Sequence, residues 1–393
     1  MIGPAGHAVE PIVVNLGHVT HLAHDCLPYL LALFQQRQVG ETERPNTRLR
    51  LPDSGTVTDF LRAWGLPDAL VEITGFRFED LLHEHSRRRF RALPPFSRYE
   101  QVIDRPDGGQ ETLLPTSFFS LTVIRPPALG LLPGLASTPE RIAAYERERW
   151  LQDRVRSVLD YYLDGDGDLV GSKAVHEAVL NAASHPKATI GYVSSQLIRG
   201  IPRGRKRGPV EALEVAIWDN GQTYSETLRG RIAQGLDVRS SSFGSKYESF
   251  DVEIPRDDGL PPDTLTLVSQ MGEFDAEYQR HVTDEVLSVA AFMLGVSSEP
   301  DATRFDPLTG EVRNDPAGSG LHDIRDVVID QFGGEVFYRT SRLGVTIKRK
   351  GSLGSYSVEV LLAGRDEPPI AGNTLLFRIP LVAATGSLGI RRA

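Results

Sequence analysis

Three polar side chains lie four residues apart in the segment 175–186, VHEAVLNAASHP. With this spacing Glu177, Asn181 and His185 share one face of a helix, because residues four apart are neighbours on a helix surface. A carboxylate can activate water, and an amide oxygen can bind a hard cation. The segment predicts a helix with either a catalytic polar face or, as the simpler alternative, a solvated one.

A second polar group follows an apolar strand. The segment 212–221, ALEVAIWDNG, is typical of a buried strand that ends in Asp219, Asn220 and Gly221. An acidic residue at this end suits recognition of an amino group such as the adenine N6, and the glycine lets the backbone approach a base. The alternative is an ordinary Asp-Asn-Gly turn.

Two glycine-containing segments lie further along the chain. In 315–338, Gly318, Ser319 and Gly320 precede a predicted helix with an apolar face. Free backbone N–H groups at such a helix start can hold a phosphate. In 371–381, AGNTLLFRIPL, a turn at Gly372 leads into an apolar strand.

These four segments, in this order, resemble the motifs of the GHKL superfamily, which includes histidine kinases, anti-sigma-factor kinases and type II topoisomerases. EAVLNAASH resembles the N-box and is most similar to that of the anti-sigma-factor serine kinases; DNG, GSGL and GNTLLFRIPL resemble the glycine boxes. The resemblance implies an α/β (α+β) Bergerat sandwich of a mixed sheet and helices over 136–393. ATP and Mg²⁺ would lie between the helices and a mobile lid.

The resemblance also implies roles for single residues. Glu177 corresponds to the glutamate that activates water or a hydroxyl, and Asn181 to the magnesium ligand. Asp219 corresponds to the adenine-reading aspartate, with Gly221 beside the base. The remaining nucleotide positions are the phosphate loop, the turn near the base and a basic residue near phosphate: Gly318, Ser319, Gly320, Leu321, Thr374 and His185. A helix cap or surface role is the alternative for His185.

The sequence departs from the family in two places. Gln222 and Thr223 stand where the first glycine box of the family usually has a second glycine. The span between the glycine boxes is longer than a typical lid. It predicts an insertion at about 223–315 that shapes the lid or a partner surface.

Other elements must position these residues. Residues 10–75 alternate strand-like and helical patterns, which predicts that 1–135 comprises a small α/β domain together with a linker. The segment RLRLPDSGTVTDFLRAWGLPDAL resembles a STAS-like module, with Ser54 as a helix cap or, alternatively, a phosphoacceptor. A long helix is predicted over 139–163.

Composition limits the classes of function. The 393 residues carry a formal charge of −9, which disfavours general nucleic-acid binding. The basic segment 199–208, RGIPRGRKRG, is either a solvated hairpin tip or a docking patch. The single cysteine, Cys26, excludes an intrachain disulfide. Because we find neither a signal peptide nor an apolar run of about 18 residues, we expect a cytoplasmic protein without a membrane span.

These observations favour an ATPase switch whose nucleotide state changes an interface with a protein partner or a second copy of the chain. One alternative is a serine/threonine kinase of the anti-sigma-factor type. Another is a non-hydrolysing ATP sensor, which Glu177 disfavours because binding alone does not need that carboxylate. A sensor histidine kinase is disfavoured because 139–163 contains no histidine.

Overall fold

The computed structural model divides into two compact units, Met1–Thr122 and Val123–Ala393. The structure describes residues 12–20, 22, 26–37, 45–91, 101–104, 110–113, 119–124, 174–175, 177–178, 181–182, 187–188, 190–199, 210–236, 238, 247–256, 260–268, 283–296, 303–305, 312–316, 320–341, 343–362 and 370–380. Within these ranges no helix has the length and apolar character needed to cross a membrane.

The first unit begins with two parallel strands connected by a helix. Strand β1 (Ile12–Asn15) pairs with β2 (Thr47–Arg50), and α1 (Cys26–Arg37) lies between them in sequence. The later elements are α2 (Gly55–Ala63), α3 (Leu66–Thr74), α4 (Phe78–Leu81), α5 (Glu84–Arg91) and the hairpin of β3 (Gln101–Asp104) and β4 (Gln110–Leu113). The strand–helix–strand–helix order predicted for residues 10–75 is confirmed.

The structure refines the helical prediction after Ser54. Ser54 occupies the N-cap position of α2, but its side chain makes no capping hydrogen bond. The helical pattern is interrupted at Gly65, whose φ of 71° is in the left-handed region that favours glycine. Pro67, in the first turn of α3, then starts a new helix, so the segment forms two helices.

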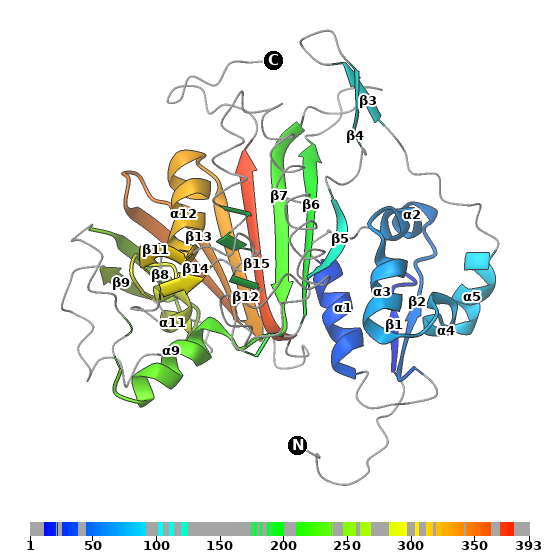
Figure 1. Ribbon diagram of the computed structural model, residues 1–393, viewed down its shortest axis with the longest axis horizontal. Coiled ribbons are helices and arrows are strands. Elements are labelled where there is room, and N and C mark those ends of the chain that lie inside the picture. The colour runs from blue at the N-terminus through cyan, green and yellow to red at the C-terminus, as the bar shows by residue number, and fades with distance from the viewer. Residues whose placement is uncertain are drawn as a thin grey trace. The chain divides into compact units, whose positions relative to one another are not determined.

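The second unit is built on one mixed sheet, in the order β5-β6-β7-β15-β12-β13-β14-β8-β9 (Figure 1). The division between the units falls inside β5 (Phe119–Ile124). The other strands are β6 (Gly191–Arg199), β7 (Val210–Asp219), β8 (Ser249–Ile254), β9 (Asp263–Val268), β12 (Glu335–Ser341), β13 (Leu343–Arg349), β14 (Ser355–Leu362) and β15 (Ile370–Pro380). Across the sheet from β6 to the edge strand β9, neighbouring strands are antiparallel, except that β14 and β8 are parallel.

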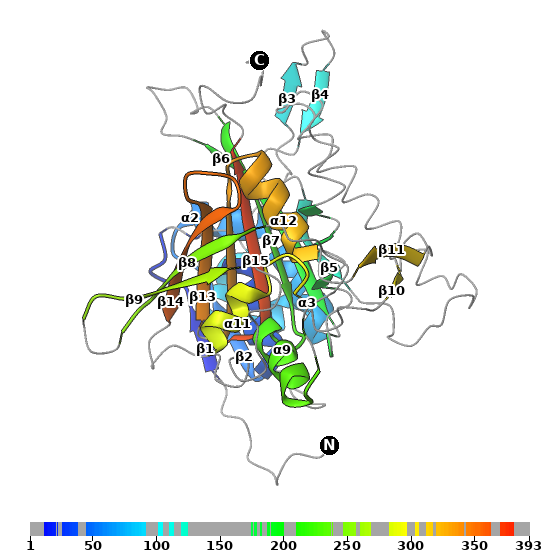
Figure 2. The ribbon, with the colours of Figure 1, turned by 90° about the vertical axis from the view of Figure 1, so that its left-hand side faces the viewer.

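Helices cover one face of this sheet. The continuous helix formed by α12 (Gly320–Arg325) and the π-helix η2 (Asp326–Gln331) packs on β12, β13 and β15 through η2. Helix α11 (Asp284–Ala290) packs on β13 and on α9 (Tyr224–Ala233). Figures 1 and 2 show these helices on the same side of the sheet. The separate hairpin is β10 (Thr303–Phe305) and β11 (Val312–Pro316).

Buried apolar side chains of the strands form the core of this unit. Residues that stand beside one another in the register, such as Val336, Ile347 and Val358, are almost completely buried. The stretch 223–315, predicted to be an insertion, supplies β8 and β9 to the same sheet and α9 and α11 to the helical layer. The predicted combination of a mixed sheet and helices is confirmed.

Candidate functional site

The carboxylate of Asp219 lies at the end of β7 and is 3% exposed. Its Oδ1 accepts a hydrogen bond from the backbone N–H of Gly221 at 2.8 Å and another from the side-chain amide of Asn373 at 3.1 Å. Asn220 fixes the turn by exchanging two hydrogen bonds with the backbone of Ile190. Neighbouring chain segments therefore hold this carboxylate in a defined orientation.

Gly372 allows β15 to approach Asp219 closely. Its φ of +84° is unfavourable for residues with a side chain, and an added Cβ would lie 1.8 Å from the carbonyl oxygen of Asp219. The Gly372 carbonyl accepts a hydrogen bond from the Thr340 hydroxyl at 2.9 Å. No other residue could occupy this position without moving one of the two strands.

Asn373 connects Asp219 to β12 and to the start of α9. It stands opposite Asp219 in the β7–β15 register. Its Oδ1 accepts from the Tyr338 hydroxyl at 2.7 Å, and its Nδ2 also donates to the Gln222 carbonyl at 2.9 Å. The Tyr338 oxygen in turn accepts from the backbone N–H of Tyr224 at 3.3 Å. Burial raises the pKa of Tyr338 far above its ordinary value, so its hydroxyl keeps its proton.

Thr374, expected near the base, lies on β15 next to Asn373. It stands opposite Trp218, one position from Asp219, and successive strand residues point to opposite faces. Asn373 rather than Thr374 therefore shares a face with Asp219. The sequence interpretation missed Asn373 and Tyr338. The DNG turn and the GN turn could have indicated the pairing of 219 with 373, but only once the two strands were known to be neighbours.

The other predicted residues lie as follows. Residues 174–175, 177–178 and 181–182 are helical, as predicted, with Glu177 5% exposed and Asn181 half-buried. Gly221 is buried at the Asp219 turn. Gly320 and Leu321 are buried at the start of α12. His185, Gly318 and Ser319 lie outside the described residues. The structure thus brings together Asp219 and Gly221 directly, and adds Asn373, Tyr338 and Gly372 to them.

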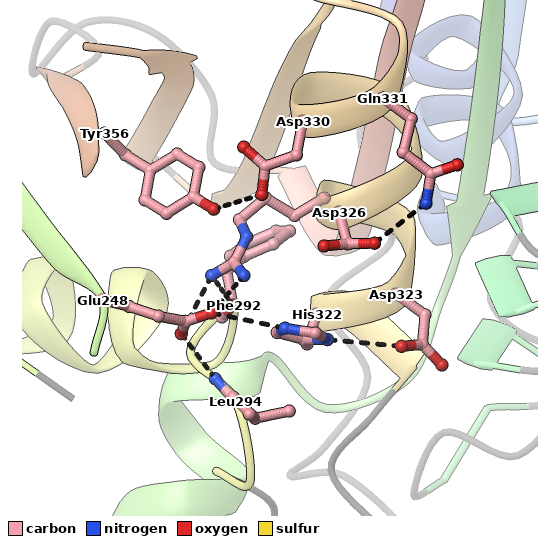
Figure 3. A network of polar contacts seen from close by, with 10 residues as sticks. Glu248, Phe292, Leu294, His322, Asp323, Asp326, Asp330, Gln331 and Tyr356 are labelled. Atoms are coloured by element: carbon pink, nitrogen blue, oxygen red, sulfur yellow. Dashed lines mark hydrogen bonds and ion pairs between the residues drawn. The ribbon is translucent and has the colours of Figure 1, made fainter. Parts of the chain in front are cut away.

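A second buried polar cluster surrounds Glu248 (Figure 3). Its carboxylate accepts from the Arg325 guanidinium at 2.5 and 3.2 Å and from the backbone N–H of Leu294 at 3.1 Å. Arg325 also donates to the Phe292 carbonyl at 3.0 Å and lies over the ring of Tyr356. Both charged side chains of the ion pair are completely buried. The cluster therefore fastens α12 to the segments just before β8 and just after α11.

His322 completes this cluster. Its Nε2 lies 3.3 Å from Glu248 and its Nδ1 lies 3.2 Å from Asp323. Burial lowers its pKa, but the hydrogen bonds to Asp323 and Glu248 more than offset this, so the net pKa is raised. Burial likewise raises the pKa of Glu248, and the donors from His322 and Arg325 reverse the shift to well below the ordinary value. Glu248 and Arg325 therefore form a buried ion pair, and His322 lies beside it.

A metal ion at this site would be bound mainly by its accompanying ligand and only in small part by protein side chains. Within the described part of the chain, no group of three or more His, Cys, Asp or Glu side chains is arranged to hold a metal ion. Magnesium bound with a nucleotide needs few protein ligands, because phosphates and water supply most of its oxygens. The carbonyl oxygen of Asn181 is of the right chemical type for one such ligand.

Comparisons with known proteins identify no relative: no protein-family model, curated protein or solved structure matches this chain.

Proposed function

We propose that this chain is a GHKL-type ATPase that binds Mg-ATP and uses it to switch an interface with a protein partner or a second copy of itself. The observation that carries the proposal is the buried, oriented carboxylate of Asp219 at a strand end, beside the buried Gly221. Such a group suits the amino group of adenine. The motif order from Glu177 to Gly372 supports the same proposal.

The proposed roles follow from chemistry. Asp219 accepts a hydrogen bond from the adenine amino group, while the start of α12 at Gly320 and Leu321 faces the phosphates. Asn181 holds the magnesium ion, which would neutralise phosphate charge when bound. Glu177 takes a proton from the attacking water as its oxygen bonds to the γ-phosphorus; the bond to the bridging oxygen breaks and ADP leaves with the electron pair.

Replacing Asp219 with alanine tests the binding part of the proposal. We expect the affinity for ATP to fall about 10- to 100-fold, because a buried hydrogen bond to a charged acceptor contributes about 1–3 kcal/mol. Calorimetric titration of folded protein measures this. The control is Asp284→Ala, which removes an equal charge from an exposed ion pair with Arg229. Equal ATP affinity for wild type and a folded Asp219→Ala variant would remove Asp219 from the site.

The same preparations separate the alternative activities. Phosphate release without protein labelling indicates an ATPase, whereas transfer of ³²P to a partner serine or threonine indicates a kinase. Tight ATP binding without either outcome indicates a sensor. Each result selects one activity for the same nucleotide site.

A further inference from the structure

His322 lies in the first turn of the helix that begins at Gly320, between two carboxylates (Figure 3). Its Nδ1 is 3.2 Å from Oδ1 of Asp323, and its Nε2 is 3.3 Å from Oε1 of Glu248. Both ring nitrogens of a protonated imidazole are donors, so each of them faces an acceptor. The two carboxylates therefore favour the charged form of the ring.

The charges of this cluster balance only when His322 carries its proton. Among the described residues, the charged groups that interact with His322 are Glu248, from the segment before β8, and Asp323 and Arg325, from its own helix. Arg325 and Glu248 form an ion pair in which both side chains are completely buried. The charge of Asp323 is then left for His322 to balance. With a neutral imidazole, the four groups would keep one uncompensated negative charge.

That uncompensated charge would lie on the most exposed member of the cluster. The side chain of Asp323 is 32% exposed, whereas that of His322 is 9% exposed. A carboxylate in the first turn of a helix competes with a phosphate for the positive end of the helix dipole, and two anions repel each other. An uncompensated Asp323 would therefore weaken phosphate binding at the start of this helix.

We propose that His322 is a positioning residue of the nucleotide site, which holds and neutralises the Asp323 carboxylate so that the helix start at Gly320 can accept the phosphates of ATP. This inference rests on the proposed function, which places the phosphates at that helix start. His322 acts through Asp323, because Glu248 and Asp323 already face its two ring nitrogens. The effect of replacing His322 should therefore depend on the charge of Asp323.

The experiment measures the affinities of ATP and adenosine by calorimetric titration at pH 6, where the raised pKa of His322 keeps its ring charged, and takes their ratio. Adenosine lacks the phosphates, so a change in folding or in the base pocket affects both ligands and cancels in the ratio. His322→Gln should lower the ratio of ATP to adenosine affinity about 5- to 30-fold, because the uncompensated carboxylate repels the phosphates. In an Asp323→Asn background, the same replacement should change the ratio by at most about twofold.

Two further arms test the same point. Asp326→Asn is the matched control, because it removes an equal charge one turn further along the same helix, from a carboxylate that accepts a hydrogen bond from Gln331. In this background His322→Gln should still lower the ratio. Raising the pH to 9 needs no His322 variant: it should lower the ratio in wild type and have much less effect in Asp323→Asn.

The outcomes separate the inference from the proposed function. An unchanged ratio in His322→Gln would overturn the inference, and so would an equal fall of the ratio in the wild-type and Asp323→Asn backgrounds. Equal affinities of wild type for ATP and adenosine would overturn it as well, because the helix start would then hold no phosphate, while the base site at Asp219 would stand. If wild type binds neither ligand, the proposed function itself fails.

Discussion

Replacing Glu177 should slow ATP turnover strongly while leaving ATP binding nearly unchanged. We expect Glu177→Ala and Glu177→Gln to lower the rate of phosphate release about 10²–10⁴-fold, the usual contribution of a general base. Affinity should stay within a few-fold, because the proposed nucleotide site binds ATP through Asp219, the metal and the helix start at Gly320, and none of these needs Glu177. The side chain is 5% exposed, so the isosteric glutamine variant avoids the cavity that alanine would leave.

Steady-state phosphate release and equilibrium ATP binding should be measured on one preparation. The control is Glu359→Ala, which changes an exposed glutamate on β14. We expect the Glu177 variants to accumulate the ATP-bound state, visible as tighter association with the partner or a second copy. Hydrolysis at the wild-type rate in a folded Glu177→Gln variant would contradict the catalytic role and leave the binding site untouched.

Replacing Glu248 should cause the largest loss of stability. Glu248→Gln leaves the guanidinium of Arg325 buried without its counter-charge, and removing one partner of a buried ion pair costs about 3–5 kcal/mol. Whole domains are stable by only about 5–15 kcal/mol. Denaturant unfolding of both proteins measures the difference. The matched control is Arg229→Gln, which breaks an exposed pair of similar length and should cost at most about 1 kcal/mol.

The loss of unfolding free energy caused by Glu248→Gln should depend on pH in a defined direction. Because the pKa of His322 is raised in the folded protein, its contribution is complete below about pH 6.5 and is lost as pH rises through the raised value. The pKa of Glu248 is lowered, so its contribution is complete above the ordinary carboxyl value of 4.5 and is lost progressively as pH falls below that value. The cost of Glu248→Gln should therefore be larger at pH 6 than at pH 9. Equal costs for Glu248→Gln and the exposed control would contradict the account.

Local patterns in the sequence predict much of the fold but not its long-range contacts. The alternation in 212–219 and the turn at Asp219 are properties of one segment, and β7 ends as predicted. The contact between Asp219 and Asn373 could not be predicted in this way, because 154 positions separate the two residues. Only the strand register decides whether Asn373 or Thr374 lies on the same face as Asp219. Glu248 and Arg325 likewise carry no local signal, since 77 positions separate them.

Hydrogen exchange of backbone amides with and without Mg-ATP tests the central claim most directly. A base held at Asp219 should slow exchange in two segments that meet there, 219–224 and 371–375, and this protection should disappear in Asp219→Ala at the same nucleotide concentration. The result that contradicts the account is ATP bound to the wild-type protein with unchanged exchange in both segments and protection elsewhere.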